Sequence, residues 1–406
     1  MSGISSVTFD LKGKEVFLAG EKVQGTWFVN VNSTVKVNFI TTYLIGATYL
    51  EWRETNLSRK DFEDDEFKTH ELYTRQVTSH PVNGDGLAPG KYKYPINYQI
   101  PKDKMHSSFE GRHGATRWFI KIEIGRPMPH SNIVKYKCFT YLANVDIDQP
   151  LYAKSISKSQ ERKISRAFGI GDAGAIKLTA SIDRSGYCPG EWALITLDVT
   201  NGTTKDLDQP SAALIQEVEF KGNGEKKITK ECIRNLVGTK LSKGNQLKWN
   251  NQKLTIDPVP PTSLLRSSYC IKCSYYIEIK VPLPFCNGED IKIKFPITIG
   301  TIPQNHKKRQ NKPSPPSYDG LNIPVTDLSN SITYTEQKKS KSCFEYSSKT
   351  LEFPKISFTP MTAYVVEYTP TATGTTPPTP SKNQAPPDYS TVQPSAPPFP
   401  SSAEKS

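Results

Sequence analysis

Runs in which apolar and polar residues alternate cover most of the first three hundred positions of the chain. Residues 35–39, 92–96 and 120–124 each carry an apolar side chain at every second position. In an extended strand these side chains share one face, so each run predicts a half-buried β-strand. Turn formers such as those at residues 83–86 separate the runs, a spacing typical of antiparallel β-sandwiches.

The alternation stops at residue 150 and returns at residue 173. Residues 150–172 are polar and basic, whereas residues 173–302 again alternate, for example at 291–299. We therefore predict an all-β body made of a first sandwich over residues 1–149, a basic linker over 150–172 and a second sandwich over 173–302. Within the first sandwich, the acidic residues 56–69 lack period-two order and predict a loop.

A short repeat connects the two predicted sandwiches. Residues 16–21 read Val-Phe-Leu-Ala-Gly-Glu and residues 186–191 read Gly-Tyr-Cys-Pro-Gly-Glu. Both place Gly-Glu at a turn before an alternating strand, which hints at a duplicated architecture.

Composition changes abruptly at residue 303. The last 104 residues hold seventeen of the 32 prolines, and a chain with so few buriable residues between prolines does not recover the entropy lost on ordering. Residues 303–406 are therefore predicted to be a disordered proline-rich tail. The exception is residues 343–368, where we expect a strand that docks on the folded body through Leu351, Phe353, Ile356, Phe358, Tyr364, Val365 and Val366.

Two copies of Pro-Pro-x-Tyr lie in this tail, at Pro315, Pro316 and Tyr318 and at Pro386, Pro387 and Tyr389. Consecutive prolines favour the polyproline II helix, which has about three residues per turn, so the first proline and the tyrosine share one face. WW domains bind such a face in an aromatic groove. The tyrosines are 71 residues apart, and a flexible chain of that length spans roughly 45–50 Å, which suits two WW domains of one partner.

A third short motif, Pro394-Ser395-Ala396-Pro397, fits the P-[ST]-A-P pattern that ESCRT components bind in an extended groove. Its position just after the second PPxY motif favours a role in sorting. Chance matches to so short a pattern are also common in tails of this composition.

The formal net charge of +12 does not indicate nucleic-acid binding, because many lysines alternate with apolar residues, as at 291–295, and so lie on a solvated sheet face. Denser basic groups at 158–166 and 306–309 suit either weak attraction to anionic membranes or a nuclear signal. No signal peptide or membrane span is predicted, so we expect a cytoplasmic protein. The seven scattered cysteines are expected to be reduced, mostly packed thiols.

Catalytic, cofactor and metal motifs give no support for an enzyme. Residues 169–174 match G-x-G-x-x-G but lack the flanking strand and helix of a dinucleotide site. Cys270 and Cys273 point to opposite faces of a predicted strand, which suits packing. The six histidines form no zinc-binding pattern, and no nucleophile elbow or Walker loop is present.

Several motifs, taken in order, resemble those of arrestin-domain-containing proteins, the α-arrestins. They lie at residues 9–10, 20–25, 87–90, 100–101, 108–114, 126–127, 186–191, 254–256 and 259–261. The most specific is Ser-Phe-Glu-Gly-x-x-Gly at 108–114. The resemblance covers residues 1 to about 302, and the PPxY tail is what α-arrestins add to this body.

This resemblance implies two arrestin-type, immunoglobulin-like β-sandwiches that act as an adaptor. In the family, the body engages receptor or transporter cargo at the plasma membrane and endosomes, and the PPxY tail brings HECT-type ubiquitin ligases through their WW domains. Ubiquitinated cargo is then internalised and sorted. The motif residues that carry over are therefore the two PPxY copies, and no motif fixes the cargo contacts.

Three other functions compete with this interpretation. An arrestin-fold subunit of a retromer-like sorting complex would not need a PPxY tail. Some α-arrestins form a disulfide with thioredoxin, but the position of their cysteine falls nearer Ser268 than Cys270 here. A receptor-desensitising arrestin of the visual type would be expected to carry clathrin-binding and phosphate-sensing elements, and no clear version of either is present.

Overall fold

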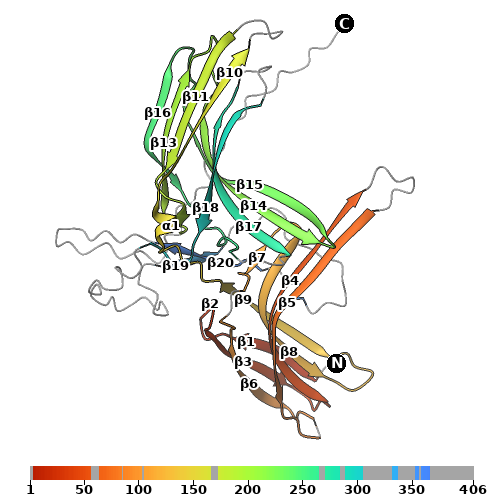
Figure 1. The fold of residues 1–406 in the computed structure, drawn as a ribbon. Helices are drawn as coiled ribbons and strands as arrows, with labels where there is room; N and C mark the ends of the chain where they lie inside the picture. Colours follow the sequence, from red (N-terminus) through yellow and green to blue (C-terminus); the bar gives the residue numbers. More distant parts are fainter. Residues whose placement is uncertain are drawn as a thin grey trace, which may run out of the picture. The chain divides into compact units, whose positions relative to one another are not determined.

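The computed structural model describes residues 3–55, 64–84, 86–102, 105–165, 172–264, 270–283, 289–304, 332–336, 353–355 and 358–365. Within these ranges the chain is almost entirely β-structure (Figure 1). The one helix among the described residues, α1 (Pro150–Ala153), is four residues long. No helix in the described part of the chain is long and apolar enough to span a membrane.

The N-terminal sandwich consists of two sheets that enclose one core. The first sheet has the order β1-β3-β6, with β1 (Ile4–Asp10), β3 (Lys22–Val31) and β6 (Gly90–Gln99). The second has the order β2-β9-β8-β4-β5, and β7 pairs with β8. Its strands are β2 (Val16–Leu18), β4 (Phe39–Thr55), β5 (Asp64–His80), β7 (Phe109–Glu110), β8 (Gly114–Gly125) and β9 (Ile133–Leu142).

The C-terminal sandwich repeats this plan. One sheet has the order β10-β11-β13-β16 and the other β12-β18-β17-β14-β15. The strands are β10 (Ile156–Ser165), β11 (Asp172–Ile182), β12 (Gly186–Tyr187), β13 (Trp192–Asn201), β14 (Ser211–Gly222), β15 (Glu225–Val237), β16 (Gln246–Thr255), β17 (Ile271–Val281) and β18 (Ile291–Ile299). The all-β, two-sandwich prediction is therefore confirmed.

The Gly-Glu turn of the N-terminal sandwich follows β2, which runs parallel to β9. Gly20 has φ of +79°, a left-handed conformation that glycine adopts without strain. The Glu21 carboxylate accepts hydrogen bonds from the Leu18 N–H, at 2.8 Å, and from Lys14 Nζ, at 2.9 Å. The carboxylate thus closes the turn and pairs with a nearby cation.

The C-terminal sandwich builds the same turn after β12, which runs parallel to β18. Gly190 has φ of +91°, and the Glu191 carboxylate accepts hydrogen bonds from the Cys188 N–H, at 2.9 Å, and from Arg184 Nη2, at 3.0 Å. Because the strand, the glycine conformation and both donors recur, the short sequence repeat marks a duplicated structural unit.

Three segments of the two sandwiches differ from the sequence-based expectations in secondary structure. Strand β10 lies inside the expected linker and pairs along its length with β11. The sequence pattern did not reveal it, because an edge strand with mostly exposed side chains needs no alternation of apolar residues. Strand β5 begins at Asp64, inside the expected loop. Residues 35–39, expected to be a strand, instead form an isolated bridge through Val35 to Leu87 before β4 begins at Phe39. Residues 332–336 also form a strand, although they lie in the tail that was expected to be disordered.

Strand β8 is buried on both faces rather than half-buried. Its inner face packs in the core with Trp118, Ile120 and Ile122, while its outer face carries Phe119 in a second apolar cluster. Lys121 is only 3% exposed; its ammonium lies over the Tyr43 ring and pairs with Glu123. The polar positions of this strand therefore do not mark a solvated face.

The C-terminal strap covers part of this outer face. We use this name for residues 353–355 and 358–365, which include β20 (Met361–Val365). Strand β20 pairs antiparallel with β19 (Ile332–Glu336), in a two-stranded sheet drawn in blue in Figure 1. The expectation that part of residues 343–368 docks as a strand is met by β20, whereas Leu351, Ile356 and Val366 lie outside the described residues.

Candidate functional site

The Ser-Phe-Glu-Gly-x-x-Gly motif lies where the two sandwiches and the C-terminal strap meet. Its serine ties the motif to β9: the Ser108 N–H donates to the Tyr141 carbonyl, at 2.8 Å, and Ser108 Oγ accepts from the Tyr141 N–H, at 3.0 Å. These two bonds fix the segment just before β7. The following side chains are thereby held in place.

The phenylalanine of the motif crosses from one sandwich to the other. Phe109 is 6% exposed and belongs to the same apolar cluster as Phe220 and Ile271 of the C-terminal sandwich. Leu50 and Trp52 of β4 belong to that cluster as well. The core of the C-terminal sandwich is therefore completed by side chains from the N-terminal one.

The two glycines of the motif allow this close approach. A methyl group at Gly111 would lie 2.5 Å from the Phe109 ring and 3.2 Å from the Phe220 ring. One at Gly114 would lie 2.6 Å from Leu50 Cβ. Distances under about 3 Å are not tolerated between carbon atoms, so both positions require glycine for packing rather than for backbone conformation.

The glutamate of the motif orients an arginine toward the strap. Glu110 forms a bidentate ion pair with Arg117, with Nε–Oε1 at 2.6 Å and Nη2–Oε2 at 2.9 Å. Burial raises the pKa of Glu110 above its usual value, and the Arg117 guanidinium opposes that shift. The geometry is the planar fork-to-carboxylate pairing that fixes an arginine in one orientation.

Arg117 then contacts the strap in two ways. Its Nη1 donates a hydrogen bond to the Pro354 carbonyl, and its guanidinium lies 4.9 Å from the centre of the Phe353 ring. The Phe353 side chain is 3% exposed and packs among residues of β4, β8 and β9, including Tyr49 and Phe119. An apolar anchor and a charge-assisted hydrogen bond thus hold the strap on the outer face of the sheet.

A second anchor lies further along the strap. The Met361 N–H donates to Thr140 Oγ1 of β9, at 2.9 Å, and the Met361 side chain packs against Val16 and Leu142. Thr362 is 1% exposed. The strap is therefore anchored to the N-terminal sandwich at two points, around Phe353 and at Met361.

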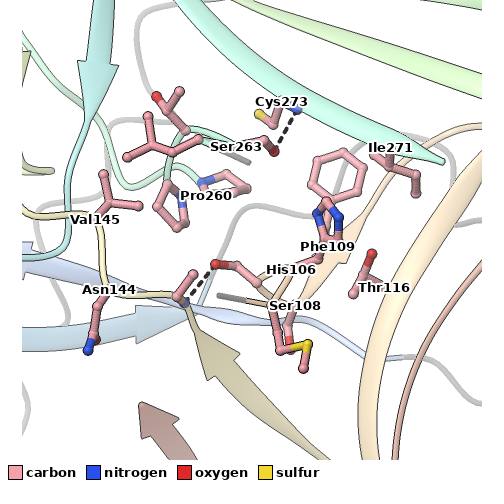
Figure 2. A pocket seen from close by; sticks show the side chains of 16 residues that line it. His106, Ser108, Phe109, Thr116, Asn144, Val145, Pro260, Ser263, Ile271 and Cys273 are labelled. Atoms are coloured by element: carbon pink, nitrogen blue, oxygen red, sulfur yellow. Dashed lines mark hydrogen bonds between the residues drawn. The ribbon is translucent and has the colours of Figure 1, made fainter. Parts of the chain in front are cut away.

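A small cavity lies between the sandwiches beside the motif (Figure 2). Its volume is about 50 Å³, and its lining includes His106 and Phe109 from one sandwich and Pro260, Ser263 and Cys273 from the other. Ligand pockets usually measure about 300–1,000 Å³. The cavity is thus a packing defect between two bodies rather than a site for a metabolite.

Titratable groups around this cavity are held neutral. Burial lowers the pKa of His106 to about 4 and raises that of the Cys273 thiol to about 12. Cys273 Sγ lies 3.2 Å from the Tyr275 hydroxyl. A thiol with so high a pKa is a poor nucleophile at neutral pH.

Raised thiol pKa values are also found at other described cysteines. Cys138, Cys188, Cys232, Cys270 and Cys273 are all free thiols, and all but Cys232 are buried. Burial and the Glu71 carboxylate raise the pKa of Cys270 to about 12, and burial also raises that of Cys232. Burial likewise raises the pKa of Cys138 to about 12, so these thiols lack the lowered pKa of a disulfide-exchanging thiol. Ser268 lies outside the described residues.

The sequence-predicted binding residues are not among those that the structure describes. Pro315, Pro316 and Tyr318 lie between the described residues Gln304 and Ile332, and Pro386, Pro387, Tyr389 and the motif Pro394-Ser395-Ala396-Pro397 follow Val365. Residues 367–406 form a separate unit of the chain. The strap's contacts with Arg117 were not predicted, since Arg117 and Pro354 are 237 positions apart in sequence.

Two family models match the body of the chain. The model for the N-terminal domain of arrestin (or S-antigen) matches residues 5–148, and that for the C-terminal domain matches residues 172–304. Together they cover both sandwiches, and only β10, α1 and the residues around them fall between the two matches.

Curated relatives match over much of the same length. The chain is 26% identical to human arrestin domain-containing protein 4 over 310 residues, which are 74% of this chain and 71% of the relative. It is 27% identical to the mouse protein of that name over 225 residues, 55% and 52% of the two chains. It is 26% identical to mouse thioredoxin-interacting protein over 322 residues, 77% and 78%. With both arrestin domains matched and folded as paired β-sandwiches, this chain belongs to the arrestin-domain-containing (α-arrestin) family.

Proposed function

We propose that this α-arrestin is an adaptor that links membrane cargo to WW-domain HECT ubiquitin ligases, and that it promotes cargo ubiquitination, endocytosis and endosomal sorting. The observation that carries the proposal is the pairing of an arrestin body with two PPxY motifs in one chain. The body would contact a receptor or transporter, and the tail would contact the ligase. No catalytic group, metal or cofactor is needed for this role.

Each motif would place its tyrosine and first proline against a WW groove, with Pro315, Pro316 and Tyr318 at one site and Pro386, Pro387 and Tyr389 at the other. Two copies would act by avidity, because binding of the first raises the local concentration of the second. In the same proposal Pro394-Ser395-Ala396-Pro397 hands cargo to ESCRT components at a later step. The protein would work in the cytoplasm, peripherally at the plasma membrane and endosomes.

Substitution of the two motif tyrosines tests the proposal. Tyr318→Ala and Tyr389→Ala should each weaken capture of the full chain by immobilised WW domains, and the double variant should abolish it. Tyr368→Ala, which removes a tail tyrosine outside any PPxY motif, is the matched control and should bind normally. Unchanged capture of the double variant would refute the proposed tail function.

The thioredoxin-interacting relatives raise a second role, mixed-disulfide formation with thioredoxin. The raised pKa values of Cys270, Cys273 and Cys232 argue against these thiols as the nucleophile. We therefore keep ligase recruitment as the proposed function.

A further inference from the structure

Pairing of β19 with β20 brings together two points that are far apart in the tail sequence. Five residue pairs form the antiparallel ladder, from Ile332 with Val365 to Glu336 with Met361. Cross-strand partners lie about 5 Å apart. The chain therefore returns almost to its starting point across this ladder, and we call the pair the β19–β20 clip.

The clip depends on the strap contacts for its stability. Strands of five residues joined by the 24 residues 337–360 would not form an isolated hairpin in water, because a two-stranded sheet is marginal and a long loop costs entropy to close. The buried Phe353 ring, the Arg117 hydrogen bond to Pro354 and the Met361 bond to Thr140 hold one of the two strands on the N-terminal sandwich. Docking thus stabilises the clip.

The two PPxY motifs lie on opposite sides of the clip. Tyr318 is 14 residues before Ile332, and Tyr389 is 24 residues after Val365. The connecting path between the tyrosines across the ladder is therefore 38 residues plus one strand spacing, rather than the 71 residues of the sequence.

We propose that the clip, held by the docked strap, shortens the spacing of the two PPxY motifs so that tandem WW domains of a single ligase molecule bind both. This inference rests on the proposed function and adds to it the kind of partner, one ligase with two WW domains in tandem. By the square-root rule for a flexible chain, a path of 38 residues spans roughly 33–37 Å, against the roughly 45–50 Å that applies to 71 residues.

The shorter path raises the effective concentration of the second motif. Effective concentration falls approximately as the −3/2 power of connector length, so the change from 71 to 38 residues raises it about 2.5-fold. The gain applies to tandem WW domains alone, since a single WW domain binds one motif at a time.

Insertion of a linker at two places in the full chain tests the clip. Forty Gly/Ser residues inserted between Glu336 and Phe353 lengthen only the loop of the hairpin, so the affinity for a purified tandem WW fragment should not change. The same insertion between Val365 and Tyr389 lengthens the connecting path and should weaken tandem binding about three-fold. Equal weakening by both insertions would overturn the proposal, because it would show that the full sequence interval connects the motifs.

Loss of docking gives an independent test. Phe353→Ala should release the clip and weaken tandem binding about 2.5-fold without changing the affinity of a single WW domain. Phe39→Ala, which removes a ring that is 40% exposed on the same sandwich, is the matched control and should have no effect. An unchanged tandem affinity for Phe353→Ala would count against the clip.

A distance measurement separates failure of the clip from failure of the proposed function. Energy transfer between dyes placed beside the two motifs, measured without any ligase, should report a shorter separation in the native chain than in Phe353→Ala. Equal separations would refute the clip even if WW domains bind. Conversely, a shorter native separation without WW binding would refute ligase recruitment while leaving the clip intact.

Discussion

Replacement of Phe353 by alanine should free the strap while leaving both sandwiches folded. The ring is 3% exposed among β4, β8 and β9 and lies against the Arg117 guanidinium. Burial of a phenylalanine side chain stabilises by about 1.5–3 kcal/mol, and a core Phe→Ala change costs about 3–5 kcal/mol where no relaxation is available. Undocking of the strap would leave no cavity inside a folded core, so we expect the smaller figure, about 2 kcal/mol, to be lost from docking.

Hydrogen exchange measures this loss directly. The Met361 N–H, bonded to Thr140 Oγ1, and the other amides of β20 exchange when the strap undocks. A loss of about 2 kcal/mol should speed their exchange roughly thirty-fold, whereas amides of the central strand β8 should keep their native rate.

Phe39→Ala serves as the control, because Phe39 lies at the start of β4 and is not part of the cluster around Phe353. It should leave exchange in β20 unchanged. The reasoning would be refuted if Phe353→Ala left the β20 amides as protected as in the native chain, or if it accelerated exchange in β8 equally.

Two further predictions concern the junction between the sandwiches. Gly111→Ala should lower the free energy of unfolding by about 1–3 kcal/mol, because its methyl group would overlap the Phe109 ring. Gly84→Ala is the control: no atom lies within 4 Å of the new methyl group, so the free energy of unfolding should change by less than about 0.5 kcal/mol. Equal effects of the two substitutions in denaturant melts would contradict the packing argument. Burial lowers the pKa of His106 from 6.5 to about 4, so its contribution to stability is complete above pH 6.5 and is lost, at up to about 1.4 kcal/mol per pH unit, as the pH falls toward 4. His106→Gln should reduce the dependence of the free energy of unfolding on pH, measured by denaturant melts between pH 4 and pH 6.5. The contribution of His113, whose pKa burial also lowers to about 4, should remain. An unchanged pH dependence would show that His106 takes up its proton without unfolding.

Alternation of apolar residues was sufficient to predict both sandwiches, because most of their strands bury one face against a single core. Strand β10 escaped prediction because its side chains are mostly exposed and its ladder with β11 holds it in place. The Gly-Glu turns were recognised from six residues each, since a left-handed glycine and a carboxylate that closes the turn need specific residue types.

The contacts of the strap were harder to foresee. The apolar residues of 343–368 indicated a docked strand, but neither Arg117 nor the outer face of β8 carries a local signal for its partner. Lys121 and Glu123 even suggested a solvated face, although Lys121 is buried over Tyr43. Long-range pairing of this kind depends on topology, which residue patterns specify only in part.

The aromatic outer face beneath the strap has a practical consequence for anyone dividing this chain into fragments. A recombinant body that ends at residue 304 would leave Tyr49, Phe119 and their neighbours facing water where Phe353 now packs. Exposed apolar surface of this kind promotes self-association and indiscriminate adhesion. Partner searches with such a fragment would then detect non-specific binding rather than specific partners, so recombinant fragments should include the strap.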